Sequence, residues 1–100
     1  MKYEFESILK KFAGDGPGWM YLRMPKNIYN EIKEVSSGDG KRRGFGAVKV
    51  EVKIGNSKWQ TSIFPDSEDK SYVLFVKKGI RQNESIELND AVKATVILLG

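Results

Sequence analysis

Two groups of basic residues are the strongest candidates for chemistry in this sequence. The first lies in a glycine-rich stretch, residues 38–46, where Lys41, Arg42 and Arg43 follow one another. Glycines let a ligand approach the backbone, and adjacent cations can contact phosphate groups. The stretch does not end in Gly-Lys-Ser/Thr, so it is not a P-loop. A charge run in a loop is usually a solvated surface, and both interpretations stay open.

The second basic group is formed by Lys77, Lys78 and Arg81. If this segment is helical, Arg81 lies four residues after Lys77 and three after Lys78, so the three side chains are neighbours. Together with Arg42 and Arg43 they would make a basic patch if folding brings the two groups together. The net charge of +4 and the isoelectric point near 9.3 favour anionic partners in general.

Three aromatic residues could contribute apolar contacts to a ligand. Trp19, Tyr21 and Trp59 could stack on bases or line a pocket. Each lies in a segment with strand character, where a large aromatic side chain more often belongs to the core. We therefore expect Trp59 in the core and favour the same place for Trp19.

The sequence contains no recognisable catalytic set. It has no histidine and no cysteine, which removes the commonest general base, the commonest metal ligand and any disulfide. Catalysis at Thr61 or Ser62 would need a lysine of lowered pKa as its base. The acidic residues Asp66, Glu68 and Asp69 lack the EF-hand pattern and are expected in a solvated turn. We predict no catalytic residues, no metal site and no cofactor.

Length and composition indicate one domain over residues 1–100. Of the 100 residues, 40% are hydrophobic and 30% charged, as in ordinary globular domains. Residues 1–6 are charged and lack the apolar run of a signal peptide. No segment approaches the roughly 18 apolar residues that span a bilayer. We therefore expect a cytoplasmic protein without a membrane segment.

The hydrophobic pattern is mostly that of β-strands. Residues 47–54 and 58–64 alternate apolar and polar side chains around Gly55-Asn56, which predicts a hairpin. Further strands are expected over residues 3–12 and 19–24, paired with each other, and over 71–76 and 92–99, the last covered on both faces.

Helical spacing is found at Ile28, Ile32 and Val35, after Pro25. A second helical turn is expected over residues 77–82. The predicted fold is mainly β: a small antiparallel, split β-barrel of about six strands with one short α-helix and a helical turn.

Five segments, in this order, resemble a known family: residues 19–25, 43–50, 59–65, 72–81 and 89–92. The family they resemble is domain-of-unknown-function family 1905. The resemblance implies a small β-barrel with a short helix, similar to split barrels of some bacterial transcription regulators and antitoxins, and no established activity. Where the family usually has Gly-Asp before the last strand, this sequence has Asn89-Asp90. Asparagine tolerates a left-handed conformation, so the turn is expected to survive.

The leading functional hypothesis is a binding module for an anionic small molecule or peptide. Its expected site is the mouth of the barrel, lined by Trp19, Arg42, Arg43, Lys77, Lys78 and Arg81. The alternatives are a nucleic-acid-binding protein and an enzyme without histidine. A protein partner, and a monomeric or homodimeric state, stay open.

Overall fold

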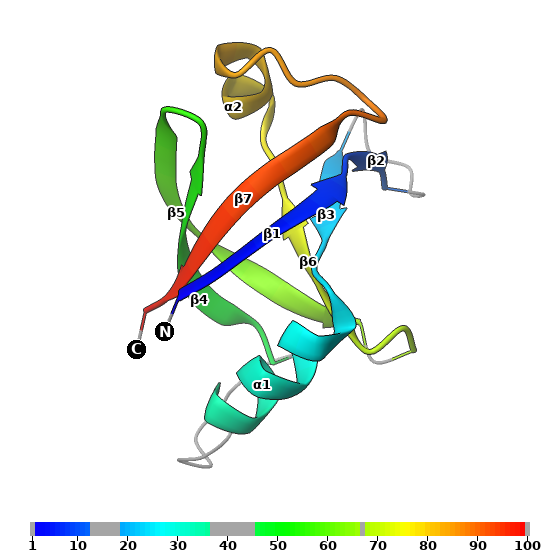
Figure 1. Ribbon diagram of the computed structural model, residues 1–100, viewed down its shortest axis with the longest axis vertical. Helices are drawn as coiled ribbons and strands as arrows, with labels where there is room; N and C mark the ends of the chain where they lie inside the picture. Colours follow the sequence, from blue (N-terminus) through cyan, green and yellow to red (C-terminus); the bar gives the residue numbers. More distant parts are fainter. Residues whose placement is uncertain (1, 13–18, 37–45, 67, 100) are drawn as a thin grey trace.

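The computed structural model describes residues 2–12, 19–36, 46–66 and 68–99, and its main feature is an antiparallel sheet curved into a nearly closed barrel (Figure 1). The described residues form seven strands: β1 (Lys2–Ile8), β2 (Lys10–Lys11), β3 (Met20–Arg23), β4 (Val48–Ile54), β5 (Ser57–Asp66), β6 (Ser71–Phe75) and β7 (Ala91–Leu98). Hydrogen bonds join them in the order β1-β7-β4-β5-β6-β3-β2. The predicted mainly β barrel is confirmed, with seven strands where about six were expected.

The barrel closes because one stretch of chain supplies both ends of the strand order. β1 pairs with β7, the chain then bends at the fully buried Leu9, and β2 pairs with β3. Backbone hydrogen bonds from Leu9 N to Asp90 O (2.9 Å) and from Asn89 N to Leu9 O (2.8 Å) hold the bend. The Ser7 hydroxyl donates to the carbonyl of Arg23 at 2.9 Å and so joins β1 to β3.

This bend corrects the prediction of a single strand over residues 3–12 paired with 19–24. Within residues 3–12, only the short strand β2 pairs with β3. β1 pairs instead with β7, the last strand of the chain. When one segment pairs with two different strands in this way, fewer strand edges of a small barrel are left unpaired. The turn before β7 is as expected, because Asn89 adopts a positive φ of 74°.

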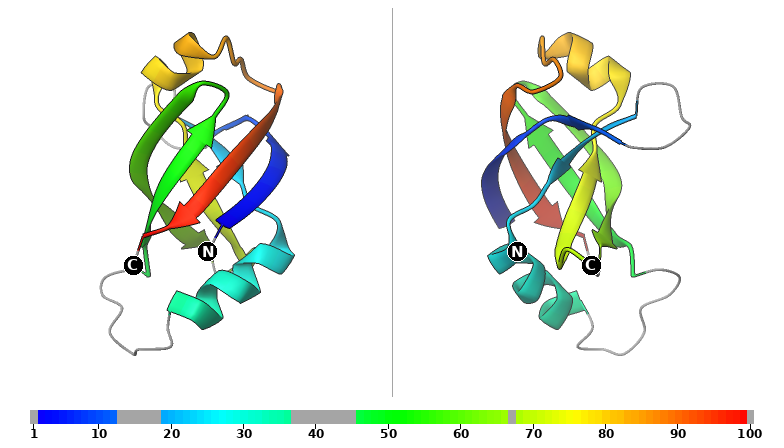
Figure 2. Two further views of the ribbon diagram at one scale, coloured as in Figure 1. Left: turned by 60° about the vertical axis from the view of Figure 1, so that its left-hand side comes forward. Right: turned by 90° about the vertical axis from the view of Figure 1, so that its right-hand side faces the viewer.

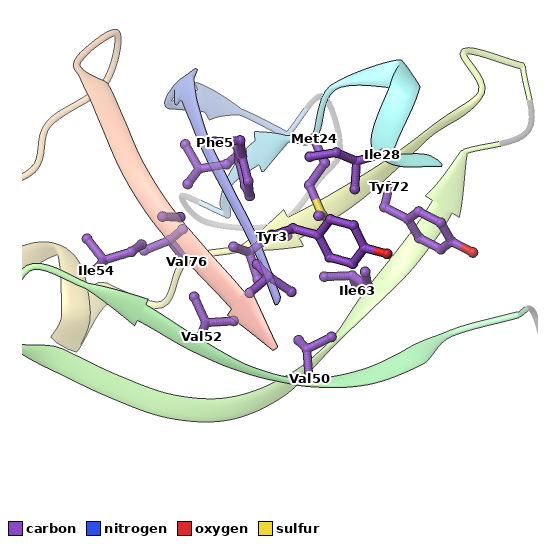
Figure 3. Close-up of a cluster of buried hydrophobic side chains, with 14 of the residues drawn as sticks. Tyr3, Phe5, Met24, Ile28, Val50, Val52, Ile54, Ile63, Tyr72 and Val76 are labelled. Atoms are coloured by element: carbon purple, nitrogen blue, oxygen red, sulfur yellow. The ribbon is translucent and has the colours of Figure 1, made fainter. Parts of the chain in front are cut away.

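The core fills the barrel interior. Val50, Val52 and Ile54 of β4 point inward, as their alternation with charged residues predicts (Figure 3). β7 follows the same rule, with Val92, Ala94 and Val96 buried and the positions between them outside the core. The expectation that β7 is covered on both faces was wrong, because a barrel has a single interior.

The two helices lie at opposite ends of the barrel (Figure 2). α1 (Lys26–Ser36) covers one end with Ile28, Tyr29 and Ile32 buried against the core, as its helical spacing predicts. α2 (Lys78–Asn83) lies at the other end, where the helical turn was expected, and buries Ile80. Within the described ranges, no helix is long and apolar enough to cross a membrane.

β5 changes partner along its length, and this change shapes the end of the barrel below α2. Residues 57–63 pair with β4 after the predicted hairpin at Gly55-Asn56, where Gly55 has a φ of +57°. Residues 64–66 pair with β6 instead. The first part of β5 and the end of β6 therefore diverge on the side of the barrel that faces α2.

Candidate functional site

A cleft lies where β5 diverges from β6, beside α2. We call it the α2 cleft. Its volume is about 330 Å³, which is within the usual range for small-molecule pockets. β3, β5, β6 and the α2 segment all contribute to its walls. The lining residues are Trp19, Met20, Trp59, Gln60, Thr61, Phe75, Val76, Lys77, Lys78 and Arg81.

Four of the six residues predicted from the sequence line this one cleft. Trp19 precedes β3, and Lys77, Lys78 and Arg81 belong to the α2 segment almost sixty positions later. The fold therefore brings Trp19 next to the second basic group. Arg42 and Arg43 lie outside the described residues.

The two tryptophans occupy the cleft in different ways. The side chain of Trp19 is 56% exposed, so its expected place in the core was wrong. Trp59 points inward in phase with Thr61 and Ile63 and packs against the core while half-buried. One face of the cleft is thus continuous with the core, and Trp19 forms its outer wall.

The cations of the cleft differ in how they are held. The Arg81 guanidinium donates from Nε to the carbonyl of Val76 at 3.2 Å, and its Nη1 lies 3.1 Å from the sulfur of Met20. These contacts fix Arg81 between α2, β6 and β3. Lys77 and Lys78 are exposed at the start of the helix. Among the described residues that line the α2 cleft there is no carboxylate, so the charge of its walls is positive.

A cluster of five aromatic side chains covers the outer surface of the neighbouring strands. We call it the aromatic face, and its members are Phe12, Trp19, Tyr21, Phe64 and Phe75. The ring of Phe75 is central: its centroid lies 5.4 Å from those of Phe12 and Trp19, 6.1 Å from Phe64 and 6.4 Å from Tyr21. Trp19 and Phe75 also line the α2 cleft, so the two features are continuous. The sequence analysis did not single out Phe12, Phe64 or Phe75.

An ion-pair cluster closes the other end of β3 and β6. Arg23 Nη1 donates to Asp66 Oδ2 at 3.0 Å, to Asp69 Oδ2 at 3.3 Å and to the buried Ser71 hydroxyl at 2.7 Å. The hydrogen bond from Arg23, with others from the backbone N–H groups of Asp69 and Glu68, lowers the pKa of the Asp66 carboxyl. These carboxylates organise the β5–β6 turn.

The walls of the α2 cleft combine cationic groups with apolar surface. Exposed ammonium groups and a fixed guanidinium can hold a carboxylate or phosphate, and the indole and phenyl rings can contact a flat group. Within the described ranges, no group of three or more acidic side chains is placed to hold a metal ion, and the chain has no histidine or cysteine.

Comparison with known proteins places the chain in a family. No curated protein matches the chain. The model of the family described as domain of unknown function DUF1905 matches residues 5–96, which include all seven strands in whole or in part and both helices. The resemblance carried by the five sequence segments is thereby confirmed, and this chain belongs to the DUF1905 family.

Proposed function

We propose that this protein is a binding module that holds a small anionic molecule with a flat apolar group in the α2 cleft. The observation that carries the proposal is the convergence of Trp19, Lys77, Lys78 and Arg81 on one cleft, from segments far apart in the sequence. An acidic peptide that presents a carboxylate next to an aromatic side chain has the same chemistry.

The size and walls of the cleft suit a ligand with one ring system. About 330 Å³ is at the lower end of the range for small-molecule sites. Trp59 supplies the inner apolar surface, and the contacting rings of Phe75 and the exposed Trp19 continue it outward. Aromatic surface of this kind favours a flat partner through stacking and burial.

The charges of the cleft favour an anion over a neutral ligand. Lys77 and Lys78 place two ammonium groups at its edge, and the described lining adds no carboxylate to neutralise them. Arg81 is already held by the carbonyl of Val76, so little side-chain freedom is lost when a ligand binds. Hydrogen bonds between these cations and an anion are stronger than neutral ones.

Tryptophan fluorescence gives a direct test, because both tryptophans of the chain line the cleft. We expect saturable changes in emission with phenyl phosphate and with benzoate, and none with the neutral benzyl alcohol. An acetylated Asp-Phe dipeptide tests the peptide form of the ligand. Release of phenol from phenyl phosphate would favour the alternative, an enzyme without histidine.

Paired variants identify the groups that bind. Changing Lys77→Gln and Lys78→Gln together should weaken phenyl phosphate binding by about tenfold, as expected when charged hydrogen bonds are lost. Lys93→Gln, on the exposed side of β7, removes one charge away from the cleft and should leave binding unchanged. The proposal is wrong if no anionic probe changes the emission, or if Lys93→Gln weakens binding as much as the double variant.

A further inference from the structure

The aromatic face is unusual because large apolar rings are gathered in water on the outside of the barrel. Trp19 is 56% exposed, Phe12 47% and Phe64 42%. These three rings surround Phe75 and contact it edge to face, so they form one patch rather than scattered side chains. Contiguous exposed apolar patches mark interaction surfaces.

The register of the strands places the rings in a row across the sheet. Tyr21 of β3 is opposite Phe75 of β6, and Lys10 of β2 is opposite Tyr21. Phe64 follows on β5, diagonal to Phe75, since it is paired with Val73. These three rings lie on neighbouring strands, so the row crosses two inter-strand spacings, or roughly 10 Å in all. Sheets that present aromatic residues in this way stack two or three bases of a single-stranded nucleic acid.

Cations lie at two borders of the row, the β2 edge and the α2 end of β6. Lys10 and Lys11 lie at the β2 edge and, with Arg23, line a groove that contains no carboxylate among its described residues. Lys77 and Lys78 follow the end of β6 and line the α2 cleft. The acidic residues of the neighbourhood, Asp66, Glu68 and Asp69, belong to the β5–β6 turn at the far end of β6. The rings near α2 are therefore bordered by positive charge.

This alternation of charge and rings matches one class of partner. Several flat groups linked by negative charges are the chemistry of a single strand of DNA or RNA. We infer that the aromatic face binds a short single-stranded nucleic acid, with two or three bases stacked on its rings. The phosphates contact Lys10 and Lys11 at one border and Lys77 and Lys78 at the other. The inference rests on the proposed function in one respect, since the cleft lysines form one side of the site.

A second copy of the chain fits this surface poorly. A two-fold interface would bring the same patch of both copies together. The lysines at both borders of the row would then face lysines of the other copy, which costs free energy without a counter-charge. A polyanion neutralises both borders at once.

The test is fluorescence anisotropy with fluorescein-labelled dT10 and rU10, with a labelled duplex as the third probe. We expect both single strands to bind at least tenfold more tightly than the duplex, and the stronger of the two identifies DNA or RNA as the partner. Four phosphate contacts predict a loss of about fiftyfold in affinity between about 50 and 200 mM salt. Unlabelled thymidine 5′-monophosphate as a competitor reports binding of a single nucleotide.

Variants outside the α2 cleft separate this inference from the proposed function. Phe64→Ala and Phe12→Ala should each weaken dT10 binding by about tenfold while leaving phenyl phosphate binding in the cleft unchanged. Phe64→Trp keeps a ring and should retain affinity. Leu99→Ala removes an equally exposed apolar side chain (39% exposed) elsewhere on the barrel and is the matched control. Lys10→Gln with Lys11→Gln should reduce the salt dependence.

Three results would overturn the inference. Oligonucleotides that bind no more tightly than thymidine 5′-monophosphate would show that the face adds nothing, while the cleft proposal would stand. If duplex and single strand bind with equal affinity, and Phe64→Ala leaves that affinity unchanged, the attraction comes from charge alone. A concentration-dependent dimer that Phe64→Ala dissociates would show that a second copy occupies the face.

Discussion

The hydroxyl of Ser57 donates a 2.6 Å hydrogen bond to the carboxylate of Glu84, which lies 27 positions later in the chain. The other oxygen of Glu84 accepts a hydrogen bond of 3.3 Å from the backbone N–H of Asn56. One carboxylate therefore joins the β4–β5 hairpin to the end of α2. Because α2 presents Lys78 and Arg81 to the α2 cleft, the hairpin helps to hold the walls of the proposed binding site in place.

The change Glu84→Gln should lower the free energy of unfolding by about 1 kcal/mol, since it replaces a charge-assisted hydrogen bond with a neutral one. Urea denaturation followed by circular dichroism measures the difference. Glu87→Gln is the control, because the side chain of Glu87 is exposed on the loop after α2. Equal midpoints for the wild type and Glu84→Gln would show that the contact contributes nothing to stability.

Gly55→Ala should be more destabilising than Glu84→Gln. Gly55 has a φ of +57°, and a Cβ atom there would collide with the carboxylate of Glu84. The substitution therefore combines a strained backbone with the loss of the hairpin contact, and we expect a loss of more than about 1 kcal/mol. Thermal unfolding of the variant measures it.

Gly79→Ala is the matched control, and its effect should have the opposite sign. Gly79 lies in α2, and nothing lies within 4 Å of the position that its Cβ would occupy. Alanine is favoured over glycine in a helix by about 0.5–1 kcal/mol, so this variant should be more stable. If both alanine variants shift the melting temperature in the same direction, the positive φ and the close approach of Glu84 at Gly55 do not explain the effect of Gly55→Ala.

The parts of the fold that could be predicted from the sequence are those set by local patterns. The alternation around Val50 and Val52 identifies the inward face of β4, and Gly55-Asn56 identifies the hairpin. The spacing of Ile28 and Ile32 identifies the buried side of α1. In each case, neighbouring residues determine which side chains face the core.

The bend at Leu9 and the α2 cleft depend on contacts between distant segments. Nothing in residues 3–12 indicates that the two halves of the run take different partners. The cleft exists because the pairing of β5 with β6 is confined to residues 64–66, which the separate strand patterns do not reveal. The sequence therefore offers Lys77, Lys78 and Arg81 as candidates, whereas their position in one cleft with Trp19 is known only from the fold.

The aromatic face could be predicted in part. Phe64 occupies the polar phase of β5, after Lys58, Gln60 and Ser62, so the alternation itself places its ring outside. Phe75 ends a run of four apolar residues that has no alternation, so its direction cannot be read from the pattern. The cluster appears once the pairing of β3, β5 and β6 brings the rings together.

The Arg23–Asp66 pair predicts a specific dependence of stability on pH. The pKa of Asp66 is lower in the folded protein than in the unfolded chain, first because of the hydrogen bond from Arg23 and then because of the backbone donors. The stabilisation is complete well above the unfolded value of about 3.9 and is lost as the pH falls towards the folded value.

Urea midpoints measured from about pH 7 to pH 2 test this dependence. Asp66→Asn should be less stable than the wild type near neutral pH, and the difference should shrink as the solution becomes acidic. Glu34→Gln removes an exposed carboxylate from α1 and is the control. A difference between wild type and Asp66→Asn that stays constant over the range would contradict the assignment.

The hydroxyl of Tyr72 is buried without a hydrogen-bond partner among the described residues. Its ring packs against Tyr29 of α1 at 5.2 Å, beside Ile28 at the α1 end of the core (Figure 3). A buried hydroxyl without a partner costs free energy, so Tyr72→Phe should raise the stability by about 1 kcal/mol. Tyr29→Phe is the matched comparison: the Tyr29 hydroxyl accepts a hydrogen bond from Lys33 at 3.4 Å, and its loss should not stabilise the protein. A loss of stability in Tyr72→Phe would show instead that the hydroxyl is satisfied in solution, because removal of a bonded group is what destabilises a core.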